Sequence, residues 1–203
     1  VKENKEILFE GAQGTLLDID HGTYPFVTSS NTSAGNAATG SGIGPLNFEH
    51  VVGVTKAYIS RVGTGPFITE QENEIGDYMI EKGAEFGTVT GRRRRCGWLD
   101  LVSLRYSRRI NSLSQLFITK LDVLSGLEEI KVCVGYKFED KKITDYPLID
   151  EILDECEPVY ESFGGWDEDI SKITKYDALP ENAKKYIEFI EEFINVPIKY
   201  ISV

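Results

Sequence analysis

Four consecutive arginines, Arg92–Arg95, are the residues of this sequence best suited to binding chemistry. They follow the glycine- and threonine-rich stretch 87–91, in a chain whose formal net charge is -11. A guanidinium is planar and always charged, and it binds a carboxylate or phosphate through two parallel hydrogen bonds. The alternative is a solvated polybasic tract, such as a nuclear localisation signal. The apolar residues that begin at Trp98 indicate a buried element instead, which favours an anion-binding loop.

A long polar segment, residues 18–45, is the second candidate for ligand binding. Long loops without secondary structure are uncommon in compact domains and are often functional. Hydroxyls, amides and glycines allow backbone N–H groups to converge on a phosphate or a base. The alternative is a flexible linker, but the anchoring side chains of Tyr24–Val27 argue against it.

Asp18, Asp20 and His21 carry the oxygen and imidazole donors that metals use. No second acidic cluster accompanies them, so the sequence predicts no metal site. His21 and His50 are the only two histidines, and we expect both to be structural.

The tetrapeptide Thr119–Asp122 is the third candidate, because it follows a predicted strand at 115–119. Ligands of parallel α/β sheets bind beyond the carboxyl ends of strands. There, the Asp122 carboxylate can accept two N–H bonds from guanine, and the Lys120 stem can cover the base. A strand-to-helix turn with an exposed aspartate is an equally simple interpretation, and the motif alone does not exclude it.

Helices and strands that could position these residues alternate along the chain. The pattern predicts an α/β fold with a mainly parallel sheet flanked by helices. We expect strands at 7–10, 58–62, 115–119, 129–136 and 196–203, an extended segment at 157–166, a short helix from residue 15, a helix that starts within 48–59, and helices at 73–83, 98–110, 147–156 and 179–194. The last of these has the clearest apolar stripe.

The composition excludes several classes of function. No apolar run approaches the ~18 residues of a membrane helix, so we expect no membrane partner. The three cysteines are far apart and form no CxxC pair, which excludes a disulfide framework and favours a reducing cytoplasm. Most of the acidic excess lies in residues 136–203, and the single basic cluster argues against nucleic-acid binding. We therefore predict a core part, 1–135, and an acidic subregion, 136–203, within one domain.

The motifs, taken in order, resemble those of adenylosuccinate synthetase. The stretches that carry the resemblance are 9–25, 27–32, 38–42, 62–66, 87–100 and 119–124. The resemblance implies the C-terminal portion of that family's fold. It implies a GTP-dependent ligase of purine (AMP) biosynthesis, which joins IMP and L-aspartate to give adenylosuccinate, GDP and phosphate. It also implies a homodimer and a requirement for Mg²⁺.

The resemblance also assigns individual residues to ligands. It places Gln13, Thr28 and Arg92 at IMP, and it places Thr88, Val89, Thr90, Gly91, Arg92, Arg93 and Arg94 in the aspartate loop. It places Arg94, Lys120, Leu121, Asp122 and Ser202 at the guanine nucleotide. Arg92 and Arg94, two residues apart, are expected to serve ligands, while the side chains of Arg93 and Arg95 are expected to point elsewhere.

The sequence departs from the family pattern in one respect. The family's glycine-rich phosphate loop is not in these 203 residues, nor are its aspartate base, which is also a magnesium ligand, and its catalytic histidine. We therefore expect a piece of a longer enzyme, with no catalytic residue of its own, inactive by itself, and with the magnesium ligands elsewhere. The alternatives are a stand-alone, non-catalytic nucleotide-binding or dimerisation module and a regulatory GTPase, which rests on Thr119–Asp122 alone.

Overall fold

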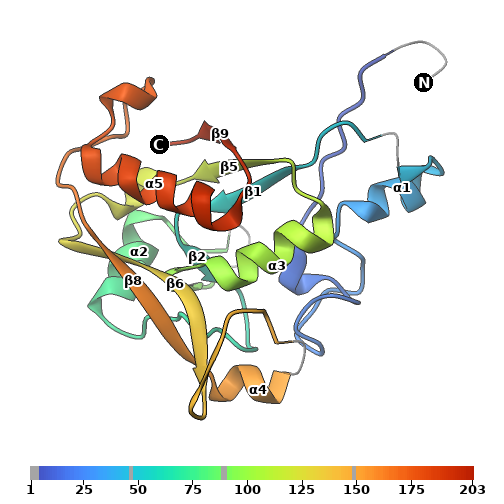
Figure 1. Ribbon diagram of the computed structural model, residues 1–203, viewed down its shortest axis with the longest axis horizontal. Helices are drawn as coiled ribbons and strands as arrows, with labels where there is room; N and C mark the ends of the chain where they lie inside the picture. Colours follow the sequence, from blue (N-terminus) through green and yellow to red (C-terminus); the bar gives the residue numbers. More distant parts are fainter. Residues whose placement is uncertain (1–4, 46–47, 88–90, 148–149) are drawn as a thin grey trace.

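Three parallel strands form the sheet at the centre of the computed structural model, which describes residues 5–45, 48–87, 91–147 and 150–203. Their order is β1-β5-β9 (Figure 1), and their bounds are β1 (Val52–Lys56), β5 (Gln115–Thr119) and β9 (Ile198–Ile201). Leu116 and Ile118 of the middle strand are completely buried. The prediction of an α/β fold with a parallel sheet flanked by helices is confirmed.

Helix α5 (Glu181–Ile194) packs its apolar stripe into the same core as the inner face of this sheet. Residues three or four apart share one face of a helix, and here that face is buried, as the sequence predicted. The Tyr186 hydroxyl also donates a hydrogen bond of 2.6 Å to the Ala57 carbonyl. This bond fastens the helix just beyond the end of β1. Helix α3 (Leu101–Asn111) lies beside α5.

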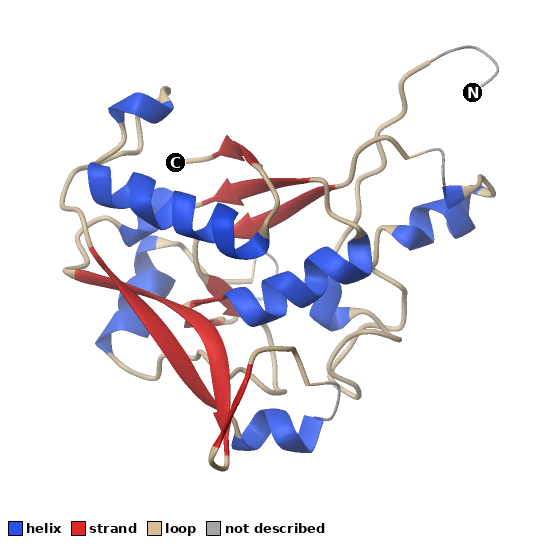
Figure 2. Ribbon diagram, viewed as in Figure 1, coloured by secondary structure: helices blue, strands red, loops and turns tan. Residues whose placement is uncertain are grey.

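Two further sheets complete the framework. Strand β2 (Ile59–Arg61) pairs antiparallel with β3 (Arg95–Gly97). Strand β4 (Leu99–Asp100) runs parallel to β6 (Glu129–Phe138), which also pairs antiparallel with β7 (Lys141–Ile143) and β8 (Glu157–Gly164). Figure 2 shows β6 and β8 as a long twisted ribbon beside the central sheet. The remaining elements are α1 (Gly35–Ser41), α2 (Glu74–Lys82), α4 (Asp150–Glu155), η1 (Thr15–Leu17), η3 (Leu121–Leu124) and η4 (Tyr176–Ala178).

Two predictions about secondary structure were wrong, and a third placed the start of a helix three residues too early. Residues 7–10 form no strand and are exposed, with Leu8 93% exposed, because no strand of the described chain pairs with them. A helix starting within 48–59 is replaced by β1, whose Val52 and Val54 lie opposite residues of β5. The helix predicted from Trp98 starts only at Leu101, because the Asp100 side chain accepts the backbone N–H groups of the first turn and caps it.

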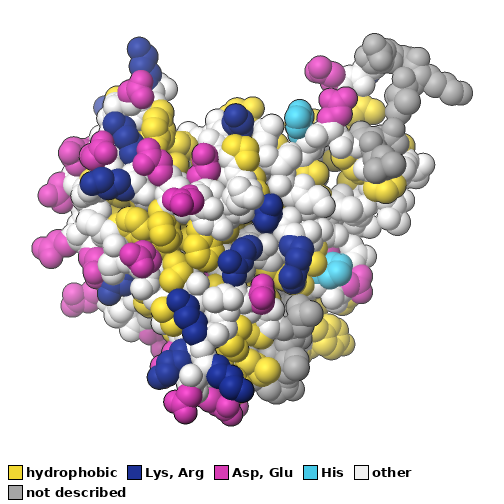
Figure 3. Space-filling view, in the orientation of Figure 1, with side chains coloured by type: hydrophobic (Ala, Val, Ile, Leu, Met, Phe, Trp, Pro, Cys, Tyr) yellow, Lys and Arg dark blue, Asp and Glu magenta, His cyan; other side chains and the backbone are white. Residues whose placement is uncertain are grey.

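The outer face of the central sheet is open among the residues described. Val52, Val54 and Tyr200 are 43%, 68% and 55% exposed, and they share this face with Phe117, whose ring centroid lies 5.7 Å from that of Tyr200. Figure 3 shows acidic side chains over α5 and the segment before it, and basic side chains over α3. Within the described ranges, no helix is long and apolar enough to cross a membrane.

Candidate functional site

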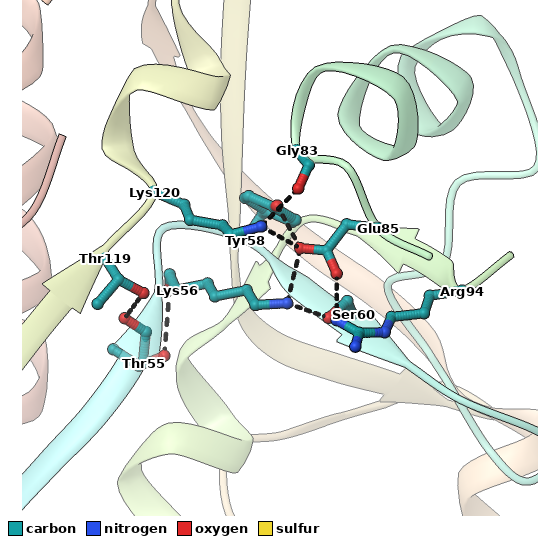
Figure 4. A network of polar contacts seen from close by, with 9 residues as sticks. All are labelled: Thr55, Lys56, Tyr58, Ser60, Gly83, Glu85, Arg94, Thr119 and Lys120. Atoms are coloured by element: carbon teal, nitrogen blue, oxygen red, sulfur yellow. Dashed lines mark hydrogen bonds and ion pairs between the residues drawn. The ribbon is translucent and has the colours of Figure 1, made fainter. Parts of the chain in front are cut away.

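The side chain of Glu85 is the centre of a buried polar cluster (Figure 4). Its carboxylate is completely buried. Oxygen Oε1 accepts hydrogen bonds from Lys56 Nζ at 2.6 Å, Tyr58 Oη at 2.5 Å and Lys120 Nζ at 3.3 Å. Oxygen Oε2 accepts one from Arg94 Nη1 at 2.8 Å. The fold thus brings the arginine stretch and the Thr119–Asp122 motif to one carboxylate, although they lie far apart in the sequence.

The parallel pairing of β1 and β5 explains why two lysines meet here. Lys56, the last residue of β1, lies opposite Thr119 of β5, and Lys120 directly follows Thr119. The carboxyl ends of parallel strands share one edge of a sheet, which is where ligands of such sheets bind. Glu85 reaches the same edge from the turn after α2. The backbone N–H of Arg94 donates to the Glu85 carbonyl at 2.9 Å, which brings the arginine alongside.

The electrostatics of the cluster favour an ionised Glu85 beside several cations. Burial by itself raises the pKa of Glu85, but the hydrogen bonds from Lys56, Tyr58 and Arg94 outweigh it and hold that pKa at about 2. Burial lowers the pKa of Lys56, and the contact with Glu85 offsets part of this effect. One carboxylate facing three cations leaves this edge of the sheet net positive, which suits a carboxylate or phosphate ligand.

The residues predicted to read guanine lie together beyond β5. Lys120 has a left-handed backbone, with φ 58°, and Leu121 and Asp122 open the short helix η3. The Leu121 N–H donates to the Ser202 carbonyl at 3.3 Å, and the Ser202 N–H donates to the Ile118 carbonyl at 2.8 Å. Ser202 therefore joins this turn through the pairing of β9 with β5. Their contact with a nucleotide stays a prediction.

The loop before the arginines is closed at its base by backbone hydrogen bonds. The Gly87 N–H donates to the Arg92 carbonyl at 2.8 Å, and the Gly91 N–H donates to the Gly87 carbonyl at 2.7 Å. Gly91 has a φ of 63°, a conformation that glycine adopts without strain. The predicted aspartate ligands Thr88, Val89 and Thr90 lie outside the described residues.

Consecutive arginines point in different directions, as successive side chains of an extended chain do. Arg94 turns inward to Glu85. Arg93 forms an ion pair with Asp77. Arg95 uses Nε and Nη2 to bind both carboxylate oxygens of Glu70, and its Nη1 donates to the Gly65 carbonyl at 2.8 Å. Arg93 and Arg95 thus have partners away from Glu85, in line with the expectation that their side chains point elsewhere. The assignment of Arg93 to aspartate stays a prediction.

Arg95 and Arg93 are expected to differ in their effect on stability. Arg95→Ala should lower the free energy of unfolding by about 2 kcal/mol, since it removes a bidentate, partly buried pair and leaves Glu70 without its partner. Arg93→Ala should change it by less than about 0.5 kcal/mol, because its ion pair is solvent-exposed. Urea denaturation of both variants measures the difference. Equal losses would contradict the distinction.

The predicted IMP residues Gln13 and Thr28 lie in the segment that Asp18 organises. Asp18 is completely buried, and its carboxylate accepts the backbone N–H groups of Asp20, His21, Thr32 and Ser33. Burial raises the pKa of Asp18, but these four hydrogen bonds outweigh it and lower that pKa. Thr28 donates its backbone N–H to the Leu17 carbonyl at 2.8 Å, and Gln13 has a left-handed φ of 61°. The Asp18 carboxylate therefore holds this segment in its folded conformation.

Arg61 connects this loop to the arginine-bearing strand. Its Nη2 donates to Thr23 Oγ1 at 2.8 Å and to the Phe26 carbonyl at 3.2 Å. Arg61 lies in β2, opposite Arg95 of β3. The structure thus links the two regions through one side chain, while no hydrogen bond among the described contacts joins Gln13 or the Thr28 side chain to the Glu85 cluster.

Sequence reasoning missed Glu85, Lys56 and Tyr58. Glu85 is a single acidic residue between two glycines, 83 and 87, and nothing in its neighbours indicates that it is buried. Lys56 offered a weak signal, since it ends a run rich in β-branched residues, Val52–Lys56, and a basic residue at the carboxyl end of a strand is well placed for an anion. Tyr58 carries no local signal of its role.

Comparisons with known proteins agree on one family. The family model described as adenylosuccinate synthetase matches residues 1–203. Two curated relatives named adenylosuccinate synthetase are 56% identical over 203 residues, in Halothermothrix orenii, and 60% identical over 201 residues, in Desulforapulum autotrophicum. They cover 100% and 99% of this chain, which in turn covers 47% of each of them. The chain thus spans about half the length of the curated relatives it matches.

A solved structure gives the same result for the fold. The structure of fully ligated adenylosuccinate synthetase from Plasmodium falciparum superposes with a TM-score of 0.96 and is 52% identical to this chain. The match covers 98% of this chain and 48% of that one. The family model, the relatives and the fold lead to one conclusion: this chain belongs to the adenylosuccinate synthetase family.

Proposed function

We propose that this chain is the part of an adenylosuccinate synthetase that recognises IMP, L-aspartate and the guanine of GTP. The whole enzyme would join IMP and aspartate, with GTP converted to GDP and phosphate. The observation that carries the proposal is the convergence of Arg94, Lys120, Asp122 and Ser202 at one edge of the central sheet. Arginine and lysine there can hold anions, and the Asp122 carboxylate can accept N–H groups of guanine.

The proposed chemistry needs the charges that these residues supply. In the first step the 6-oxygen of IMP takes the phosphoryl group of GTP, and in the second the aspartate amine displaces that phosphate. Arg92 and Arg94, with the 88–91 loop, would hold the two aspartate carboxylates and leave the amine free to attack. Fixed cations also balance the negative charge of the transferred phosphoryl group. Gln13 and Thr28 would contact IMP.

Magnesium is assigned no ligand in this chain. A magnesium site needs oxygen ligands, usually one or two carboxylates together with substrate phosphates. In the ranges that the structure describes, no three His, Cys, Asp or Glu side chains gather in a group that could hold a metal ion. Asp18, the best buried carboxylate of the 18–21 segment, is occupied by backbone N–H groups. In this proposal the chain's own residues bind and orient the substrates, while the magnesium ligands and the groups that move protons belong to the rest of the enzyme.

Several properties of the whole enzyme belong to the same proposal. We propose a homodimer in the cytoplasm, with residues 1–135 as the recognition part and residues 136–203 as an acidic subregion of the same domain. Parallel sheets are almost always covered on both faces. The open face of Val52, Val54 and Tyr200 therefore supports a place for further polypeptide against β1 and β9. The alternative, a non-catalytic nucleotide-binding or dimerisation module, makes a different prediction below.

Turnover and binding assays test the proposal. With GTP, IMP, aspartate and Mg²⁺, the full-length enzyme that contains this chain should form adenylosuccinate, and the chain by itself should not. Titration calorimetry should still detect IMP binding to the chain at millimolar concentration. Turnover by the chain alone at a normal rate would contradict its assignment as a recognition part. A full-length enzyme without turnover would favour the non-catalytic module.

A further inference from the structure

We propose that Glu85 is a positioning residue that holds two cations in one arrangement. These are Arg94 of the arginine stretch 92–95 and Lys120 of the turn 119–122, which is proposed to bind guanine. In this arrangement the aspartate site and the guanine site form together. The inference rests on the proposed function, which gives those two cations their ligands. Glu85 itself touches neither ligand in this proposal and acts through the two side chains that it binds.

The geometry of the carboxylate carries the inference. Oε2 accepts from Arg94 at 2.8 Å, and Oε1 accepts from Lys120 at 3.3 Å and from Lys56 at 2.6 Å. The carboxylate is completely buried, so water cannot replace a partner that moves away. A shift of one cation therefore changes the hydrogen bonds available to the other.

The turn that carries Glu85 reinforces this connection. The Lys120 ammonium also donates to the carbonyl of Gly83, two residues before Glu85. The Arg94 N–H donates to the Glu85 carbonyl at 2.9 Å, and the Glu85 N–H donates to the Ile80 carbonyl at 2.8 Å, at the end of α2. Backbone carbonyls of this turn and the Glu85 side chain thus bind both Arg94 and Lys120. Helix α2 holds the turn in place.

Glu85 does not use every hydrogen-bond donor of Arg94. The Arg94 Nη1 group donates to Glu85, while the buried Nε–H has no hydrogen-bond acceptor among the described residues. An unpaired buried donor is costly and calls for an explanation. A ligand carboxylate or phosphate beside Arg94 would supply that acceptor, so Glu85 orients the guanidinium without using all of its donors.

The charge of Glu85 is what allows three cations to share this edge. Lys56, Arg94 and Lys120 repel one another, and the carboxylate between them offsets that repulsion. An amide of the same shape has one acceptor oxygen and one donor NH₂ group. Glu85→Gln therefore cannot accept hydrogen bonds from both sides, and it leaves Arg94 or the lysines without a partner.

Steady-state kinetics of the full-length enzyme test the inference. Glu85→Gln is expected to raise the KM for aspartate and the KM for GTP together, each about tenfold, because both cations lose their fixed position. The matched control is Asp100→Asn, which changes another buried carboxylate to an amide at the N-terminus of α3, where Asn also caps well. The control should leave both KM values within about twofold of the wild type.

A second variant keeps the test decisive if Glu85→Gln does not fold. Lys120→Met removes a cation assigned only to guanine. At saturating GTP it is expected to raise the KM for aspartate about threefold or more, through the shared carboxylate. An unchanged aspartate KM in Lys120→Met, or a rise of only one KM in Glu85→Gln, would overturn the positioning role. Wild-type turnover is measured first, since its failure would overturn the proposed function instead.

Discussion

Replacing Asp122 by Asn is expected to raise the KM for GTP by about 100-fold and to create activity with xanthosine triphosphate. In the proposed role, the Asp122 carboxylate accepts two N–H groups of guanine, and hydrogen bonds to charged groups are worth about 1.5–3 kcal/mol each. Asn keeps one acceptor oxygen but not the charge, so one of these bonds is lost and the other is weakened, which corresponds to a factor of about 100. An Asn NH₂ group instead opposes the guanine donors and matches the 2-oxygen of xanthine.

The structure explains why Asp122 is suited to this role. It lies in η3, directly beyond the carboxyl end of β5. Its carbonyl accepts the Ser125 N–H at 3.1 Å, while Leu121 beside it bonds to Ser202 at 3.3 Å. The backbone of this turn is therefore held on both sides, and we predict that the carboxylate is the part that contacts guanine.

Steady-state assays of the full-length enzyme with GTP and with xanthosine triphosphate measure this change of specificity. The matched control is Asp140→Asn, the same chemical change in the exposed turn between β6 and β7. The control should keep the wild-type preference for GTP. If Asp122→Asn also kept it, Asp122 would not read the base, and the interpretation of Thr119–Asp122 as an ordinary strand-to-helix turn would stand.

Replacing Glu85 by Gln is expected to lower the free energy of unfolding by an amount that depends on pH. The ordinary pKa of 4.5 falls to about 2 in the folded chain. A lowered folded pKa stabilises the fold above the unfolded pKa and loses that effect as the pH falls toward the folded pKa. The stabilisation is on the order of 3 kcal/mol at pH 7. It should decline from about pH 5 and be lost near pH 2.

Urea denaturation of the wild type and Glu85→Gln between pH 7 and pH 2 measures this dependence. The two curves of unfolding free energy should differ most near neutral pH and converge in acid, because protonated Glu85 is neutral like Gln. Glu161→Gln, at an exposed position of β8, is the control and should follow the wild type at every pH. A difference that stayed constant with pH would show that Glu85 stabilises the fold through its shape and not its charge.

The sequence alone determined the features that depend on neighbouring residues. The 115–119 strand has its predicted bounds, and the helix predicted at 179–194 forms over Glu181–Ile194, because the spacing of apolar side chains is a local property. The α/β class and the family also followed from the sequence, since the motifs and their order are properties of the chain itself.

Strand pairing required the tertiary structure. Residues 7–10 are as apolar as β5, yet they stay exposed, while Val52–Lys56 became a strand despite a helix-like pattern. A strand's hydrogen bonds go to another segment, so its stability depends on whether a partner lies alongside. Here β5 pairs with β1 residue by residue. The periodicity of one segment does not contain that information.

Only the tertiary structure showed which charges face one another. Glu85 is one of 33 acidic residues, and in sequence it is no more prominent than the exposed ones. Its burial comes from α2, β1, the arginine stretch and the turn after β5, which meet at one edge of the sheet. Electrostatic interaction depends on distance and on exclusion of water, and chain order specifies neither. The sequence therefore identified the arginines and the lysine as ligand-binding candidates, whereas the fold decided that a single buried carboxylate holds them together.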